Sequence, residues 1–176
     1  MIPALVLTAG HATRLRPLSF VRAKAAVPVA GEPLASRILR GLAAAGVTDA
    51  VLNLHHLPHT LTTLIGDGAD AGVRVRYSWE VPVLGSAGGP RRALPLLGAS
   101  TFLIVNGDTL ADIDIAAVVA DHRRSGALVT MAVVPNNEPD KYGGVMAAND
   151  GTRISGLYPR LLQDRVSRCT DAPSPK

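Results

Sequence analysis

Residues 4–18 read ALVLTAGHATRLRPL, and more of the fold follows from this stretch than from any other. Its first four residues form a short apolar run typical of a buried strand, and Gly10 then opens a turn. After the turn come two arginines, Arg14 and Arg16, and further on Lys24. Ligands of an open α/β sheet bind beyond the carboxyl ends of its strands. This loop therefore predicts a polyphosphate site made of backbone N–H groups and fixed cations.

The composition indicates one domain, or one domain and a tail. A chain of 176 residues can bury about 70% of the surface that its unfolded form exposes. Apolar residues make up 47% of the chain and aromatic residues only 3%. A core poor in aromatic residues favours buried parallel strands with covering helices over a β-barrel.

Charge and hydropathy indicate which kinds of binding partner to expect. The net charge is +4, but the basic residues are scattered and no aromatic residues lie between them, so we expect no nucleic acid partner. Arginine matches the oxygens of a small phosphorylated ligand in pairs. No apolar stretch approaches the roughly eighteen residues of a membrane span, and no basic leader precedes the first strand. We therefore expect a cytoplasmic protein with no membrane partner. A single cysteine, Cys169, excludes an internal disulfide within this sequence.

Strand and helix signals alternate along the chain. This alternation predicts βαβ units in a three-layer α/β fold, with a mostly parallel, twisted sheet and helices on both faces. One helix is expected to start at Pro33 and to stop at Gly46, and another to be capped by Asp112 or Asp114. A β-hairpin is expected around residues 149–151. The predicted strands cover residues 4–7, 50–54, 73–77, 102–105 and 128–134.

Two further segments contain residues suited to binding a nucleotide. Residues 80–90 read EVPVLGSAGGP, and small residues ahead of a helix let a base or a phosphate approach the backbone. Residues 104–109 read IVNGDT, in which Asp108 follows a buried strand and can hold Mg²⁺ against phosphate oxygens. Taken singly, each segment also fits an ordinary turn, and residues 10–24 also fit a solvated surface loop. The loop that begins at Gly10 matches neither a dinucleotide fingerprint nor a P-loop.

In this order, the segments resemble the sugar-1-phosphate nucleotidyltransferase family, which includes mannose-1-phosphate guanylyltransferases and glucose-1-phosphate thymidylyl- and uridylyltransferases. The family pattern G-x-G-T-R-L-x-P-L reads GHATRLRPL at residues 10–18, and P-K-x-x-x-P-V reads AKAAVPV at 23–29. The pattern L-G-T-A-G reads LGSAG at 84–88, and a later strand ends in Gly107-Asp108. The resemblance spans about residues 3–158. It implies a Rossmann-like nucleotidyltransferase core over residues 1–158. Residues 159–176 contain several prolines and show little periodicity, so we expect them to form a loose tail.

The resemblance also implies a role for each matched position. Arg14, Lys24 and Asp108 would be the catalytic groups, with Asp108 as the Mg²⁺ ligand. Tyr142 and Gly143 would contact the sugar phosphate. The nucleotide would be bound by Leu7, Ala9, Gly10, Thr13, Arg14, Lys24, Glu80 and Gly85.

The reaction that the resemblance implies joins two anions. An oxygen of a sugar 1-phosphate attacks the α-phosphate of a nucleoside triphosphate, pyrophosphate leaves, and a nucleotide sugar forms. The protein then has to neutralise charge and align the reactants. It needs no general base, because a phosphate monoester is already ionised at neutral pH.

The chain departs from the family pattern at several positions. Ala12 stands in place of the second glycine, which we expect to be tolerated with a negative φ, and Ala23 stands in place of a proline. Residues 156–160 read Gly-Leu-Tyr-Pro-Arg where many members have a Glu-Lys-Pro that contacts the sugar phosphate. The sequence also ends before the family's sugar-binding segment and second metal-binding aspartate.

These departures leave two alternatives open beside nucleotide-sugar synthesis. One is an impaired relative that binds a nucleotide or a partner and regulates. The other is nucleotidyl transfer to another phosphorylated acceptor, such as choline phosphate. The expected partners are a nucleoside triphosphate and a sugar 1-phosphate, and the sequence leaves a homo-oligomer open.

Three histidines, His55, His56 and His59, suggest a metal site at first sight. Pro58 interrupts the helix on which His55 and His59 would share a face, and no third ligand has a recognisable spacing. A strand-end loop beside the nucleotide site is the favoured interpretation.

Overall fold

A computed structural model describes residues 2–138, 143–148 and 153–158, of which 157 and 158 are described by their backbone only. The chain divides into two compact units, residues 1–130 and 131–176, which we describe separately. The predicted tail, residues 159–176, and Tyr142 lie outside the described residues.

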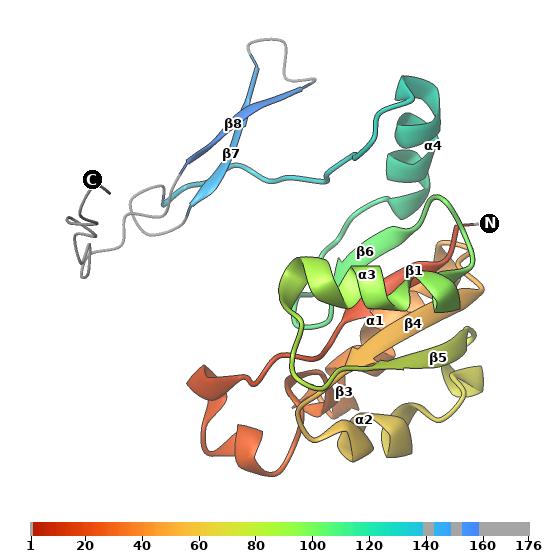
Figure 1. The fold of residues 1–176 in the computed structure, drawn as a ribbon, viewed down its shortest axis with the longest axis vertical. Helices are drawn as coiled ribbons and strands as arrows, with labels where there is room; N and C mark the ends of the chain where they lie inside the picture. The colour runs from red at the N-terminus through yellow and green to blue at the C-terminus, as the bar shows by residue number, and fades with distance from the viewer. Residues whose placement is uncertain (1, 139–142, 149–152, 159–176) are drawn as a thin grey trace, which may run out of the picture. The chain divides into compact units, whose positions relative to one another are not determined.

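A four-stranded parallel sheet forms the centre of the first unit, in the order β5-β4-β1-β6 (Figure 1). The strands are in register, so that Leu7 of β1 lies beside Asn53 of β4 and Asn106 of β6. All four strands therefore end at one edge of the sheet. Their bounds are β1 (Ala4–Leu7), β4 (Asp49–Leu54), β5 (Arg74–Trp79) and β6 (Leu103–Asn106).

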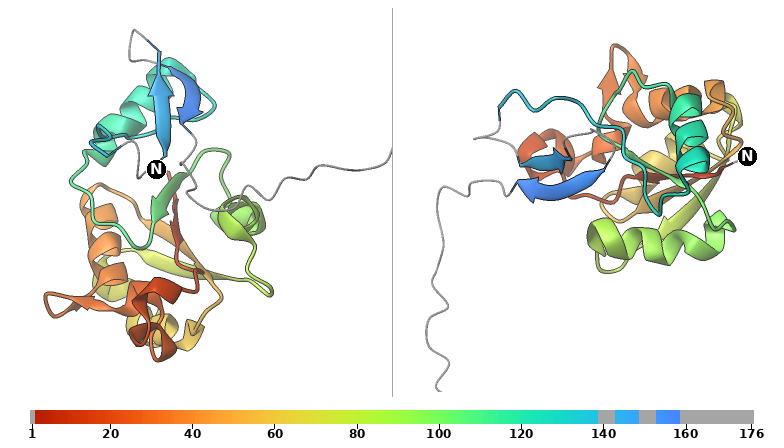
Figure 2. Two further views of the ribbon diagram at one scale, coloured as in Figure 1. Left: turned by 90° about the vertical axis from the view of Figure 1, so that its left-hand side faces the viewer. Right: turned by 90° about the horizontal axis from the view of Figure 1, so that it is seen from above.

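Helices cover both faces of this sheet, as Figures 1 and 2 show. Because side chains alternate along a strand, Val6 and Leu52 pack with Leu39 of α1 on one face. Leu5 and Val51 pack with α3 on the other face. The predicted three-layer α/β fold is confirmed. The helices are α1 (Leu34–Ala44), α2 (Pro58–Ile65), α3 (Gly85–Leu97) and α4 (Ile115–Ser125).

Short elements shape the loop after β1. Three 3-10 turns build it, η1 (Thr13–Leu15), η2 (Leu18–Phe20) and η3 (Lys24–Ala26). A small antiparallel pair then follows, β2 (Pro28–Val29) and β3 (Glu32–Pro33). A further 3-10 turn, η4 (Ala69–Ala71), precedes β5.

The helix ends refine the sequence predictions. Pro33 is the residue before α1 rather than its first residue. Asp114, and not Asp112, caps α4, since its Oδ1 accepts a hydrogen bond from the backbone N–H of Ala117 at 2.9 Å. The small residues from Gly85 onward form the first turns of α3 rather than a loop ahead of it.

The predicted strand at residues 128–134 is wrong. These residues carry no strand, and Leu128 is 100% exposed. A strand needs a neighbour for its backbone hydrogen bonds, and no strand among the described residues pairs with this segment. Apolar composition showed which residues suit a strand but not whether a partner strand exists.

The second unit contains the predicted hairpin. Its strands β7 (Gly144–Ala147) and β8 (Ile154–Tyr158) pair antiparallel, with an irregularity between Met146 and Ala147. In neither unit does a helix of the described residues have the length and apolar character needed to cross a membrane.

Candidate active site

The sheet brings the three sequence motifs to the same edge. Residues 10–24, which we call the triphosphate segment after the role that the sequence predicts for them, follow β1. Residues 80–85, the base segment, follow β5, and Gly107 and Asp108 follow β6. In a parallel sheet the carboxyl ends of adjacent strands form the ligand crevice. The register therefore explains how motifs far apart in the sequence can serve one site.

Lys24 and Asp108 form an ion pair at this edge. The Lys24 Nζ lies 2.5 Å from Asp108 Oδ2, and the two side chains are 32% and 44% exposed. The hydrogen bond from Lys24 holds the pKa of Asp108 below its usual value, with a smaller contribution in the same direction from the Thr109 hydroxyl. Asp108 is therefore a carboxylate at neutral pH, in contact with a cation that solvent can reach.

Arg14 does not join this pair. It lies in η1 with an exposed side chain, and it makes no hydrogen bond or ion pair with another residue that the structure describes. The structure thus brings together two of the three predicted catalytic residues. The Arg14 guanidinium keeps all of its donors available for a ligand.

Ala12 adopts a left-handed backbone, with φ 49° and ψ 41°. The condition under which we expected alanine to be tolerated here, a negative φ, is therefore not met. The backbone turns here to start η1, and the carbonyl of Ala12 accepts a hydrogen bond from Leu15 N at 2.9 Å. A left-handed conformation is costly for a residue with a Cβ, which explains the glycine of the family pattern.

Behind the crevice lies a buried polar network. Thr8 N donates to Asn53 Oδ1 at 2.6 Å, and the Thr8 hydroxyl donates to the Asn53 carbonyl at 2.5 Å. Asn53 Nδ2 donates to Glu80 Oε1 at 2.8 Å, and Leu84 N donates to Glu80 Oε2 at 2.8 Å. Asn53 is 4% exposed and Glu80 1%. Hydrogen bonds satisfy these buried groups and link the ends of three strands to the base segment.

Glu80 was predicted as a nucleotide-binding residue, and the network gives its side chain a different environment. Both carboxylate oxygens accept hydrogen bonds from within the protein. In this structure the side chain holds the backbone at Leu84, directly before Gly85.

Close backbone approaches explain two further glycines. A Cβ on Gly107 would lie 2.5 Å from the Leu7 carbonyl oxygen. A Cβ on Gly89 would lie 2.6 Å from Glu80 Oε1 and 2.8 Å from Asn53 Nδ2. Only glycine lets these segments approach so closely without displacing the network.

The other predicted nucleotide-binding positions lie along the same edge. The Leu7 carbonyl accepts a hydrogen bond from Gly107 N at 3.0 Å, and Ala9 is buried. Gly10 and Thr13 are exposed, and a Cβ on Gly10 would meet nothing within 4 Å. Gly85 is exposed with φ +73°. The predicted sugar-phosphate residue Gly143 lies in the second unit.

Thr8 and Asn53 did not appear among the predicted site residues. Asn53 carried a signal that could have been used, because it is the one polar residue between Ala50 and Leu54 in a buried strand. A polar side chain inside such a run needs partners. The sequence does not show what those partners are.

The donor set at this edge suits magnesium better than a metal held by protein alone. The described residues include no group of three or more His, Cys, Asp or Glu side chains that could hold a metal ion. Mg²⁺ commonly uses one or two carboxylates together with substrate phosphates and water. Asp108, ionised and accessible, fits that role.

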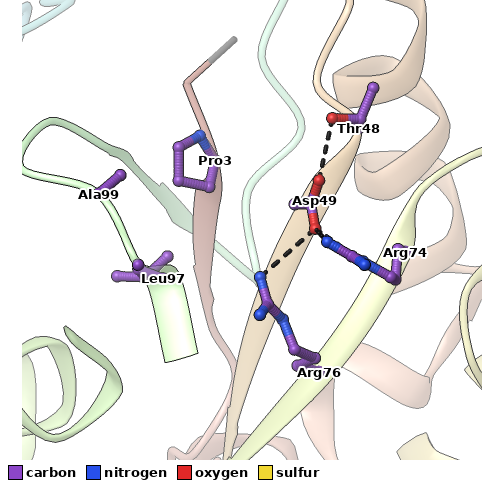
Figure 3. Close-up of a pocket in the computed structure, with 8 residues that line it drawn as sticks. Pro3, Thr48, Asp49, Arg74, Arg76, Leu97 and Ala99 are labelled. Carbon is purple, nitrogen blue, oxygen red and sulfur yellow. Dashed lines mark hydrogen bonds and ion pairs between the residues drawn. The ribbon is translucent and has the colours of Figure 1, made fainter. Parts of the chain in front are cut away.

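A cavity of about 320 Å³ lies at the opposite edge of the sheet (Figure 3). Asp49 Oδ1 accepts a hydrogen bond from Arg74 Nε at 2.8 Å, and Arg76 Nη2 lies 3.4 Å away. The hydrogen bond from Arg74 is the main cause that lowers the pKa of Asp49. Two guanidinium groups of this cavity thus share the single carboxylate of Asp49 across β4 and β5, and all three groups lie at the amino ends of the strands, away from the crevice.

Comparisons with known proteins agree with the geometry. The family described as Nucleotidyl transferase matches residues 3–158. A mannose-1-phosphate guanylyltransferase of Mycobacterium tuberculosis is 34% identical over 144 residues, which cover 82% of this chain and 40% of the relative. An N-acetylmuramate alpha-1-phosphate uridylyltransferase of Neisseria meningitidis is 44% identical over 115 residues, covering 65% of this chain and 50% of the relative.

A solved structure shares the fold. HddC from Yersinia pseudotuberculosis, complexed with GMP-PN, superposes with a TM-score of 0.71 at 21% identity, covering 91% of this chain and 70% of that one. The chain spans about half the length, or less, of the mycobacterial and neisserial relatives. The family match over residues 3–158 agrees with the resemblance seen in the sequence, and the chain belongs to the nucleotidyl transferase family.

Proposed function

We propose that the protein transfers a nucleotidyl group from a nucleoside triphosphate to a sugar 1-phosphate. The observation that carries this proposal is the ion pair between Asp108 and Lys24, the last residue of the triphosphate segment, at the carboxyl edge of the sheet. A cation and an ionised carboxylate in one accessible place suit a substrate that brings both phosphates and a divalent metal. The names of the two relatives support the same reaction.

The chain's own residues account for charge neutralisation. Lys24 donates to phosphate oxygens once it leaves Asp108, and Arg14 presents a planar guanidinium that matches two phosphate oxygens. These interactions stabilise the α-phosphate as the acceptor oxygen attacks it and pyrophosphate leaves. The Glu80 network holds the base segment in a fixed shape, which aligns the α-phosphate for an in-line attack.

Magnesium belongs to this proposal as a cofactor. Asp108 would hold it together with phosphate oxygens and water, and the ion would supply further neutralisation of the triphosphate. Lys24 occupies one oxygen of Asp108 in the structure, so we propose that this oxygen becomes available to hold a metal ion when Lys24 turns to the phosphates of a bound nucleotide.

The proposal for the acceptor is based on a residue of the second unit and on the family likeness. Gly143 precedes β7, and with Tyr142 it is proposed to contact the sugar phosphate. The two relatives act, by their names, on mannose 1-phosphate and N-acetylmuramate 1-phosphate. We therefore propose a sugar 1-phosphate as acceptor.

A pyrophosphate-release screen tests the proposal. The four nucleoside triphosphates are each combined with a panel of sugar 1-phosphates and with choline phosphate, in the presence of Mg²⁺. We expect release with a sugar 1-phosphate, starting with GTP and UTP, the nucleotides that the names of the relatives imply. Asp108→Ala and Arg14→Ala should each lower the rate at least a hundredfold.

Three outcomes would contradict the proposal. Unchanged turnover in Asp108→Ala would show that Asp108 is not a catalytic residue and that the proposed site is wrong. Release with choline phosphate alone would assign a different acceptor. Nucleotide binding without release under any condition would instead favour a binding relative.

A further inference from the structure

We infer that His55 and His56 are positioning residues that hold the base segment and the triphosphate segment at a fixed spacing. The inference rests on the proposed function, because it concerns how one nucleotide reaches both segments. It gives a role to a histidine cluster, His11, His55 and His56, that the proposed reaction does not use.

His55 holds the base segment. Its Nδ1 lies 2.9 Å from the backbone carbonyl oxygen of Glu80. A carbonyl oxygen only accepts hydrogen bonds, so the ring must carry a proton on Nδ1 and donate it. This bond fixes the residue at which β5 leaves the sheet and the base segment begins.

His56 holds the triphosphate segment through the opposite ring nitrogen. Its Nε2 lies 2.6 Å from the backbone carbonyl oxygen of Ser19, which is 2% exposed. By the same argument, Nε2 is the protonated nitrogen. Adjacent residues at the end of β4 thus donate to two segments that come from different strands.

His11, which belongs to the triphosphate segment, makes a second contact between this segment and the two histidines after β4. Its ring centroid lies 4.8 Å from that of His55, with the ring planes at 88°, and 5.7 Å from that of His56. The edge-to-face geometry is a favourable packing for aromatic rings. The end of β4 therefore contacts the triphosphate segment at His11 and at Ser19, and the base segment at Glu80.

Two neighbouring polar residues, Asn53 and His59, have surroundings that differ from those of His55 and His56. Asn53, two residues before His55, binds Thr8 and Glu80 by its side chain. His59, one turn further along, is exposed and has no ring contact with the cluster. Among the described residues, no group of three or more His, Cys, Asp or Glu side chains is arranged to hold a metal ion.

A fixed spacing matters only for a ligand that touches both segments. A nucleoside triphosphate binds with its base on one segment and its phosphates on the other, so its affinity gains from their preset separation. Tripolyphosphate reaches only the triphosphate segment. Loss of the His55 hydrogen bond should therefore weaken nucleotide binding and leave tripolyphosphate binding nearly unchanged.

The test compares four proteins: the wild type, His55→Leu, His55→Asn and His59→Leu. Leucine removes the donor, whereas the Nδ2 of asparagine occupies nearly the same place as the histidine Nδ1. His59→Leu is the matched control on an exposed histidine. Calorimetry measures the affinity for the nucleotide that the wild type binds. Competition against this nucleotide measures the affinity for tripolyphosphate.

We expect the nucleotide affinity of His55→Leu to fall about tenfold, with the tripolyphosphate affinity within twofold of wild type. His55→Asn should restore most of the loss, and His59→Leu should match the wild type. Four results would each overturn the inference. In His55→Leu, the affinities for both ligands fall equally, or the nucleotide affinity does not fall at all. Alternatively, His55→Asn does not restore the nucleotide affinity, or the wild type binds nucleotide but not tripolyphosphate. A folded wild type that binds no nucleotide would instead contradict the proposed function.

Discussion

Lys24 and Asp108 are 84 positions apart in the chain, and their charged atoms lie 2.5 Å from each other. The contact exists because β1 and β6 are neighbours and both end at the crevice. From the sequence, each residue could be assigned by its motif, one in a basic loop and one after a buried strand. Their pairing could not, because it depends on the strand order.

Replacing Ala12 with glycine should stabilise the protein. Ala12 has φ 49°, and glycine adopts this conformation without the cost of a Cβ. We expect Ala12→Gly to raise the free energy of unfolding by about 0.5–1 kcal/mol, measured by urea denaturation. Ala30, with φ 51° in the turn between β2 and β3, is a matched control, and Ala30→Gly should give a similar gain. A loss of stability in Ala12→Gly alone would show that this backbone is not left-handed in solution.

The Asp49 pair predicts a pH dependence of stability. Its folded-state pKa is depressed, mainly by the hydrogen bond from Arg74, so its stabilisation is present above the unfolded pKa and is lost as the pH falls through the folded value. At pH 6, Asp49→Asn should therefore be less stable than wild type by up to about 1 kcal/mol. The difference should shrink below about pH 4, near the unfolded value. Melting temperatures of both proteins between pH 3 and 6 measure it, and a difference that stays constant over this range would contradict a stabilisation by the Asp49 charge.

At the scale of elements, the sequence patterns identified most strands and helices because their apolar spacing reflects burial. The alternation in β4 placed Leu52 and Val51 on opposite faces, and each packs against a different helix. Residues 128–134 show the limit of this reasoning, since an apolar run indicates a strand only if a neighbour is there to pair with it. The Asn53 network shows another limit, because its partners come from β1 and β5.

The close approach of β6 and β1 gives a prediction for Gly107. A Cβ at this position would overlap the Leu7 carbonyl and the Thr8 methyl group, so Gly107→Ala must shift one of the two strand ends. We expect a loss of about 1–3 kcal/mol in the free energy of unfolding. Gly41, inside α1 and with nothing within 4 Å of a Cβ, is the control, and Gly41→Ala should be stabilising by about 0.5–1 kcal/mol. An unchanged stability of Gly107→Ala would contradict the approach of the two strands.

At the scale of the whole molecule, the core and the predicted nucleotide-binding residues belong to the same unit. Among the described residues, every buried apolar side chain lies between Ala4 and Leu97, and the partly buried Leu103 and Val105 of β6 pack against this core. The triphosphate segment, the base segment and Asp108 all belong to residues 1–130. The family could be identified from motifs in this unit because they lie at the ends of its strands. Gly143, the predicted sugar-phosphate residue that the structure describes, lies outside this unit.

The central claim is the proposal that Lys24 binds the phosphates of a nucleoside triphosphate and that Asp108 holds the accompanying magnesium ion. Calorimetric titration of the four nucleoside triphosphates with Mg²⁺ into wild type, Lys24→Met and Arg74→Met tests this most directly. Arg74 forms the same kind of ion pair at the opposite edge of the sheet, so Arg74→Met controls for the loss of such a pair. We predict that the wild type binds at least one nucleotide, that Lys24→Met weakens this binding tenfold or more, and that Arg74→Met leaves it within twofold. A folded wild type that binds none of the four, or a Lys24→Met protein that binds as tightly as wild type, would contradict the claim.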